Sequence, residues 1–173
     1  MKKTIIICLA FIGSMHVANS QTKAEKKEAK EEKAQNEYET VEALINSNEY
    51  IFEADWARTQ KGRRVSLIGN PNYLKINNKD AKAQLPYFGV VQNASYGGNA
   101  GIEFESELTE YKIKNYDKKK KIVITSKAKN KSEQFDLTLT VYHSGSASLY
   151  ISSISRNGIT YDGKVKQVEE PKE

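Results

Sequence analysis

Cysteine and histidine are nearly absent from this chain of 173 residues, which contains one Cys and two His. These side chains supply thiolate nucleophiles and most zinc ligands, and a zinc site usually takes three or four Cys, His or carboxylate ligands. A single cysteine also cannot form a disulfide within the chain. We therefore predict no disulfide, no metal site and no bound cofactor.

Long hydrophobic runs are absent as well. Residues 5–12 (Ile-Ile-Ile-Cys-Leu-Ala-Phe-Ile) form an apolar run far shorter than the roughly twenty residues that span a bilayer, so we expect no transmembrane segment. Lys2 and Lys3 precede this run, and the small residues 18–20 (Ala-Asn-Ser) follow it. This order is typical of a secretory signal peptide that is cleaved before Gln21. We expect an exported protein that is periplasmic or extracellular after cleavage.

Removal of residues 1–20 would also remove Cys8 and His16, which leaves His143 as the only histidine. Cys8 lies in the middle of the apolar run rather than at its end, so we expect no lipid anchor. Two of the 27 basic residues are lost with the signal peptide, and the 25 that remain against 22 acidic residues give a net charge of +3. This charge is too small to indicate nucleic-acid binding.

The chain after the cleavage site divides by composition into a charged segment, a domain and a short tail. Residues 21–38 are rich in Lys and Glu, and residues 22–36 contain no large apolar side chain, so we predict a flexible tether. From Thr40 onward, apolar residues at helical spacing predict one short amphipathic helix with Thr40 as its N-cap. We assign residues 39–168 to a single β-rich domain and residues 169–173 to a disordered tail.

Most of the domain alternates apolar and polar side chains with the period of two that is typical of a half-buried strand. Asn78 is predicted to cap a helical turn that ends at Ala83. Gly145 and the pair Asn157-Gly158 predict hairpin turns, the second of type I′. The predicted strands are residues 50–56, 64–68, 73–76, 102–108, 111–116, 121–128, 133–142, 147–154 and 159–165.

This pattern predicts a mainly β fold, an antiparallel β-barrel or sandwich of about eight to nine strands with one short N-terminal helix. We favour a closed or nearly closed sheet, because long exposed edges promote aggregation.

The middle and end of the chain contain an ordered set of short motifs: Asn-Pro-Asn-Tyr-Leu at 70–74, Leu-Pro-Tyr-Phe-Gly at 85–89, Tyr-Gly-Gly at 96–98, Gly-Ile-Glu-Phe at 101–104 and Ser-Gly-Ser-Ala at 144–147. Together they resemble a family of exported bacterial proteins, chiefly from Bacteroidetes, that is catalogued only as a domain of unknown function, number 4251. The resemblance covers roughly residues 40–166. It implies a periplasmic or surface location in a Gram-negative cell, and it assigns no activity and no catalytic residue.

Few residues could support catalysis. His143 lies beside the predicted hairpin turn at Ser144, where we interpret it as a solvated turn residue rather than a general base. Glu103, Glu105 and Glu107 project from one face of a predicted strand, and we interpret them as its solvated face rather than as an acid–base pair. We assign no catalytic residue and rank an enzyme third among the hypotheses.

The strongest charge feature is a run of four lysines, Lys118, Lys119, Lys120 and Lys121, at the tip of a predicted hairpin. Lysines at such a tip are commonly solvated and discourage pairing with another sheet edge. The functional alternative is a basic patch for anionic lipid headgroups or acidic glycans. The sequence leaves both interpretations open.

Aromatic residues gather in the middle of the chain, where Tyr73, Tyr87, Phe88 and Tyr96 lie among the motifs. A tyrosine buries an apolar ring and keeps a polar hydroxyl, which suits the wall or mouth of a ligand cavity. The same residues also suit an ordinary β core. We name these four as candidate ligand-binding residues.

Two hypotheses of function follow. The first is an exported, non-enzymatic binding module for a small apolar or amphipathic ligand, lined by the four aromatic residues. The second is an envelope interaction or structural protein that docks through the basic hairpin and the charged tether. An internal cavity would favour the first, and a packed interior with an exposed patch would favour the second.

Overall fold

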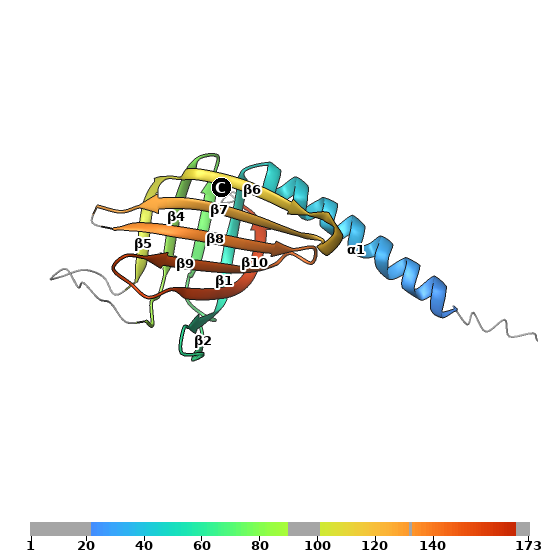
Figure 1. Ribbon diagram of the computed structural model, residues 1–173, viewed down its shortest axis with the longest axis horizontal. Coiled ribbons are helices and arrows are strands. Elements are labelled where there is room, and N and C mark those ends of the chain that lie inside the picture. The colour runs from blue at the N-terminus through green and yellow to red at the C-terminus, as the bar shows by residue number, and fades with distance from the viewer. Residues whose placement is uncertain (1–21, 90–100, 132, 169–173) are drawn as a thin grey trace, which may run out of the picture.

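The computed structural model describes residues 22–89, 101–131 and 133–168 of the chain (Figure 1). The predicted signal peptide, the predicted tail and Tyr96 lie outside these residues. The elements are helix α1 (Lys23–Asn46), strands β1 (Glu49–Thr59), β2 (Arg64–Ser66), β3 (Tyr73–Asn77), β4 (Asp80–Leu85), β5 (Ile102–Glu107), β6 (Thr109–Tyr116), β7 (Lys121–Lys129), β8 (Gln134–Tyr142), β9 (Ser146–Ser153) and β10 (Ile159–Gln167), and the 3₁₀-helix η1 (Asp117–Lys119).

The strands form one antiparallel sheet in the order β5-β4-β3-β1-β10-β9-β8-β7-β6, and β2 pairs with β1 beside this path. The last strand pairs with the first, so that Phe52 in β1 is opposite Val165 in β10. β5 and β6 stand at the two ends of the order, but only Leu108 separates them in the chain. The sheet therefore curls into a nearly closed barrel (Figure 1), which confirms the predicted antiparallel fold.

Apolar side chains fill the inside of the barrel. In β8, Phe135, Leu137, Leu139 and Val141 are buried, and the residues between them are not. Full burial of such a side chain contributes about 1.5–3 kcal/mol, so this alternation is the main source of stability. The largest fully buried side chains are Tyr50, Tyr161, Phe52, Phe135, Ile45, Leu74, Leu85, Ile102, Ile122, Leu149, Ile151 and Ile159.

Helix α1 is longer than the sequence predicted. It begins at Lys23 rather than near Thr40, so residues 23–38, which the composition predicts to be a flexible tether, are helical. Thr22 and Glu25 form a capping box: the Glu25 backbone N–H donates to Thr22 Oγ1 (3.3 Å), and the Thr22 N–H donates to Glu25 Oε2 (2.8 Å). This reciprocal cap satisfies two backbone donors that a helix start otherwise leaves unpaired.

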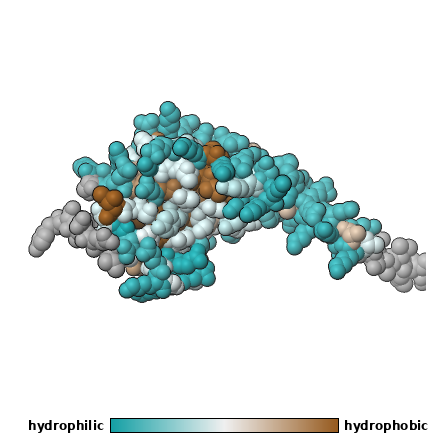
Figure 2. All heavy atoms as spheres, viewed as in Figure 1, coloured by the Kyte–Doolittle hydropathy of each residue, from teal (hydrophilic) through white to brown (hydrophobic). Residues whose placement is uncertain are grey.

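The two halves of α1 have different surroundings. Residues 22–33 are exposed, and this half projects beyond the barrel with a mainly hydrophilic surface (Figures 1 and 2). In the second half, Tyr38, Val41 and Ile45 are buried against the barrel. No helix in the described part of the chain is both long and apolar enough to cross a membrane.

Polar contacts hold α1 beside β6 at one end of the barrel, here termed the helix end. The Tyr38 hydroxyl donates to Asp117 Oδ1 (2.9 Å), and the Asn115 amide donates to a carboxylate oxygen of Glu42. In the part of the chain that the structure describes, β6 pairs with β7 alone, and these two contacts place α1 beside the end of β6.

The predicted helical turn between Asn78 and Ala83 is wrong. Residues 80–85 form strand β4, in which Ala81, Ala83 and Leu85 are buried at alternate positions. Pairing with β3 and β5 on either side satisfies the backbone of this segment, and this tertiary context outweighs the helix propensity of alanine.

The predicted type I′ turn at Asn157-Gly158 is also wrong, because neither residue has positive φ. The segment instead belongs to a longer connection between β9 and β10. Gly158 lies under the Tyr150 ring, and a Cβ there would come within 2.1 Å of the Tyr150 hydroxyl oxygen. By contrast, Gly145 has φ of 78° in the turn between β8 and β9, as the sequence predicts for a hairpin.

Candidate ligand-binding groove

Three residues of neighbouring strands form a row on the outer face of the barrel. Tyr73 in β3 is opposite Gln84 in β4, and Gln84 is opposite Glu103 in β5. Side chains at opposite positions of antiparallel strands share a face, with Cβ atoms about 5 Å apart. Gln84 and Glu103 are exposed and Tyr73 is half-buried. The row therefore presents a phenol, an amide and a carboxylate side by side.

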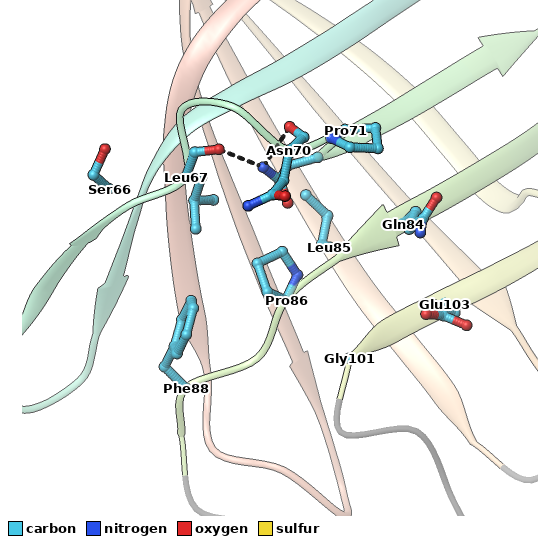
Figure 3. A pocket seen from close by; sticks show the side chains of 11 residues that line it. Ser66, Leu67, Asn70, Pro71, Gln84, Leu85, Pro86, Phe88, Gly101 and Glu103 are labelled. Carbon is cyan, nitrogen blue, oxygen red and sulfur yellow. Dashed lines mark hydrogen bonds between the residues drawn. The ribbon is translucent and has the colours of Figure 1, made fainter.

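A first hollow of about 470 Å³ opens next to this row. Figure 3 shows Gln84 and Glu103 on one side of it, Leu67 and Phe88 on the other, and Pro86 between them. The first side is polar, and the second combines the apolar Leu67 and Phe88 with the polar Ser66 and Asn70. The remaining lining residues are Pro71, Asn72, Leu85 and Gly101.

The wall that contains Leu67 is a braced loop between β2 and β3. Asn72 is buried, and its side-chain amide donates hydrogen bonds to the carbonyl oxygens of Leu67 (2.8 Å) and Asn70 (2.9 Å), dashed in Figure 3. The Leu67 backbone N–H donates to the carbonyl oxygen of Asp55 in β1 (2.9 Å). A wall fixed before binding lowers the ordering cost that a ligand must overcome.

A second hollow, also of about 470 Å³, lies on the outer face of β3, β4 and β5. It shares Gln84 and Glu103 with the first, and we term the two together the Gln84 groove. Lys82 Nζ lies 2.8 Å from Glu105 Oε2 along this second part. The lining residues are Tyr73, Lys82, Ala83, Gln84, Glu103, Phe104, Glu105, Asn130 and Lys131.

Two backbone segments that line the groove are held from the β10 side of the barrel. The Tyr161 hydroxyl donates to the carbonyl oxygen of Pro86 (2.8 Å), and Arg156 Nη1 donates to that of Gly101 (3.0 Å). Burial raises the pKa of Tyr161 above its usual range, so the hydroxyl remains a neutral donor. Residues with no place in the groove thus fix its shape.

Arg156 is itself fixed by a buried ion pair. Its Nε lies 3.0 Å from Glu133 Oε2, and the side chains of Arg156 and Glu133 are only 13% and 7% exposed. The Ser153 hydroxyl also donates a hydrogen bond to the Glu133 carboxylate. The guanidinium lies 5.3 Å from the ring centre of Tyr87. The Tyr87 hydroxyl donates to the carbonyl oxygen of Asn157 (2.8 Å). Burial raises the pKa of Tyr87, although the positive charge of Arg156 acts to lower it.

The structure separates the four aromatic residues that the sequence singled out. Tyr73 and Phe88 both line the Gln84 groove, one in each hollow. Phe88 is 39% exposed, whereas Tyr87 is buried beside Arg156. Tyr96 lies outside the described residues. Neighbouring residues 87 and 88 thus have different environments, one in the barrel wall and one in the groove.

The lysine run lies at the helix end, opposite to the groove. Lys118 and Lys119 are exposed. Lys120 Nζ donates to Gln35 Oε1 of α1 (2.6 Å), and Lys121 Nζ lies 5.2 Å from the ring centre of Tyr116. Half of the run therefore has contacts within the protein.

The other candidate polar residues lie apart from one another. His143 Nδ1 is 2.9 Å from Glu37 Oε2 of α1, so this turn histidine contacts the helix. Of the three strand glutamates, Glu103 and Glu105 line the groove. Within the residues that the structure describes, no three His, Cys, Asp or Glu side chains are placed to hold a metal ion.

Sequence reasoning missed Gln84, Arg156 and Glu133. The alternation of Ala81, Ala83 and Leu85 would place Gln84 on the outer face of a strand, but alanines also suit a helix, so that pairing with β3 and β5 decides its position. The Arg156–Glu133 pair carries no comparable signal, because strand register brings the two residues together.

The fold and the groove define a class of protein: a nearly closed antiparallel barrel with an amphipathic groove on its outer surface. The chain belongs to the family described as a domain of unknown function (DUF4251), whose model matches residues 32–165. It is similar to the crystal structure of a DUF4251 family protein from Bacteroides eggerthii, with 17% identity and a TM-score of 0.60 over 77% of this chain and 89% of that chain. At this identity the likeness concerns the fold alone. No curated protein matches the chain.

Proposed function

We propose that the protein is an exported, non-enzymatic binding module that holds a small amphipathic ligand in the Gln84 groove. Buried apolar side chains pack the inside of the barrel, so the described residues do not form the internal cavity that the sequence leads us to expect for a binding module. The proposal therefore places the ligand in the groove on the outer surface. The volume of each hollow lies within the range of small-molecule sites, about 300–1,000 Å³.

One observation carries the proposal: the two hollows share Gln84 and Glu103, which stand side by side on the outer face of β4 and β5. A ligand that crosses this pair meets polar groups at its centre, Phe88 on one side and Tyr73 on the other. The braced loop at Asn72 and the hydrogen bond from Arg156 to Gly101 support a preformed site.

Native mass spectrometry of the protein purified gently from its own host tests the binding function. We expect a small molecule that is retained in the native state and lost on denaturation. Gln84→Ala should lose this molecule, and Gln167→Ala, a matched change of an exposed glutamine in β10, should retain it. A clean protein mass, or a ligand that both variants retain equally, contradicts the proposal.

The same spectrum tests export. A mature chain that begins at Gln21 supports cleavage by signal peptidase. A chain that retains residues 1–20 contradicts it.

A further inference from the structure

We infer that the ligand of the Gln84 groove is a neutral oligosaccharide. This inference rests on the proposed function and narrows it to one ligand class.

The hydrogen-bonding groups of the groove suit hydroxyls. Asn70 and Gln84 line it, and each side-chain amide both donates and accepts hydrogen bonds, whereas the Asn130 amide is engaged within the protein by the Glu103 carbonyl oxygen and the Glu133 N–H. A hydroxyl is likewise a donor and an acceptor at once. The Gln84 amide and the Glu103 carboxylate on the sheet face, with the Asn70 amide on the loop beside them, can therefore bind several hydroxyls.

The aromatic rings suit the C–H face of a sugar. Phe88 lines the first hollow and Tyr73 the second, with Gln84 and Glu103 shared between them. An aromatic ring provides a rigid apolar surface, and the tyrosine adds a polar hydroxyl at its edge. Because one ring stands in each hollow, the groove fits a ligand of at least two sugar units rather than a single one.

The charges of the groove balance. Lys82 and Lys131 oppose Glu103 and Glu105, and the Lys82–Glu105 pair is in direct contact at 2.8 Å. A surface with equal numbers of both signs gives no net attraction to an anionic or a cationic ligand. This balance favours a neutral ligand.

The strand edges argue against an extended peptide. Strands β3 and β4 have partners on both sides. At the outer edge of β5, Asn130 Nδ2 donates to the Glu103 carbonyl oxygen (3.2 Å), and the Lys129 N–H donates to Ser106 Oγ (3.2 Å). A peptide that adds to a sheet needs a free edge, and here the end of β7 and the turn after it contact this edge.

Binding to an array of neutral oligosaccharides of glucose, mannose and galactose tests the inference, followed by calorimetry of the best binder. We expect tighter binding of a trisaccharide than of its monosaccharide. Gln84→Ala and Tyr73→Ala should each weaken binding by about tenfold or more. The matched controls Gln167→Ala and Tyr142→Ala, both at exposed strand positions outside the groove, should bind as the wild type does. Circular dichroism verifies that every variant is folded.

The outcomes separate the ligand class from the binding function. An empty array together with a retained molecule that Gln84→Ala loses overturns the oligosaccharide and leaves the binding function standing. An empty array together with a clean native mass overturns both. Oligosaccharide binding that the groove variants leave unchanged overturns the site.

Discussion

Gly163 allows β10 to approach the bulge in β1 closely. The register between the two strands shifts between Ala54 and Trp56, as expected where an extra residue bends a strand. A Cβ at position 163 would lie 1.9 Å from the carbonyl oxygen of Glu53 and 2.9 Å from the Cα of Ala54. Both contacts are with backbone atoms, so a side chain there would force the two strands apart.

We therefore expect Gly163→Ala to lower the free energy of unfolding by about 1–3 kcal/mol, measured by urea denaturation. Lys164→Ala changes the exposed neighbouring residue and should remain within about 0.5 kcal/mol of the wild type. Equal stability of the two variants would show that the bulge can shift without cost.

Glu133 is the buried counter-charge of Arg156. Glu133→Gln leaves the buried guanidinium of Arg156 without its counter-charge, and loss of one partner of a buried pair costs about 3–5 kcal/mol. Glu31→Gln, which removes a partner of the exposed Lys27–Glu31 pair, should cost about 0.5 kcal/mol or less. Thermal unfolding of both variants compares the two changes, and equal midpoints would contradict a structural role of the buried pair.

The candidate site was only partly predictable from single residues. Tyr73 and Phe88 could be named because aromatic side chains stand out in the motifs. Gln84 has no such chemical distinction, and its importance comes from its position opposite Glu103. Arg156 acts on the groove through the Gly101 carbonyl, a contact between residues 55 positions apart that no local pattern encodes.

At the scale of elements, helix α1 combines a part that packs and a part that does not. Residues 22–33 contact solvent, and Tyr38, Val41 and Ile45 contact the barrel. Local charge pairs and the capping box support the first part, and burial supports the second. The two parts should therefore contribute very differently to the stability of the barrel.

We expect a shortened protein that begins at Ala34 to have a free energy of unfolding within about 0.5 kcal/mol of that of a protein that begins at Gln21. Chemical denaturation of both proteins measures the difference. A protein that begins at Glu42 also lacks the buried Tyr38 and Val41 and should lose about 2–5 kcal/mol. A large loss from the first truncation would show that the projecting half stabilises the barrel.

Elements in which apolar and polar side chains alternate regularly were predictable from the sequence, and the others were not. Strands β7 to β10 follow the alternation of the sequence closely. The start of α1 was missed because the prediction relied on an apolar face, whereas Thr22 and Glu25 at capping-box spacing are the local signal. β4 was missed because alanines at alternate positions also suit a helix, and only its two neighbours decide in favour of a strand.

At the scale of the whole molecule, buried tyrosines make stability depend on alkaline pH. Burial, with a hydrogen bond to Asp117, raises the pKa of Tyr38 from 10.0 to about 12. Burial also raises the pKa of Tyr50 and of Tyr161. The folded protein thus binds phenolic protons more tightly than the unfolded chain does.

This stabilisation is complete below pH 10, where tyrosines of the unfolded chain are protonated, and it is lost as the pH rises toward about 12. We expect the free energy of unfolding to fall across this window, together with the appearance of phenolate absorbance. Tyr38→Phe should make the fall of the free energy of unfolding with pH less steep. The part of this fall that is due to Tyr50 and Tyr161 should remain. A flat profile across the window would contradict this account.

The pairing of β1 with β10 also sets an order of events in time. Two pairs of strands that are neighbours in the chain form hairpins, β3 with β4 and β8 with β9. Each hairpin can form as soon as both of its strands have been synthesised. Tyr50 is opposite Gln167, so β1 has no partner on that side until nearly the whole chain has been synthesised. A nascent chain that ends before Ile159 keeps open edges on both β1 and β9, and such edges invite aggregation. The arrival of β10 is therefore the step that turns an open sheet into a barrel.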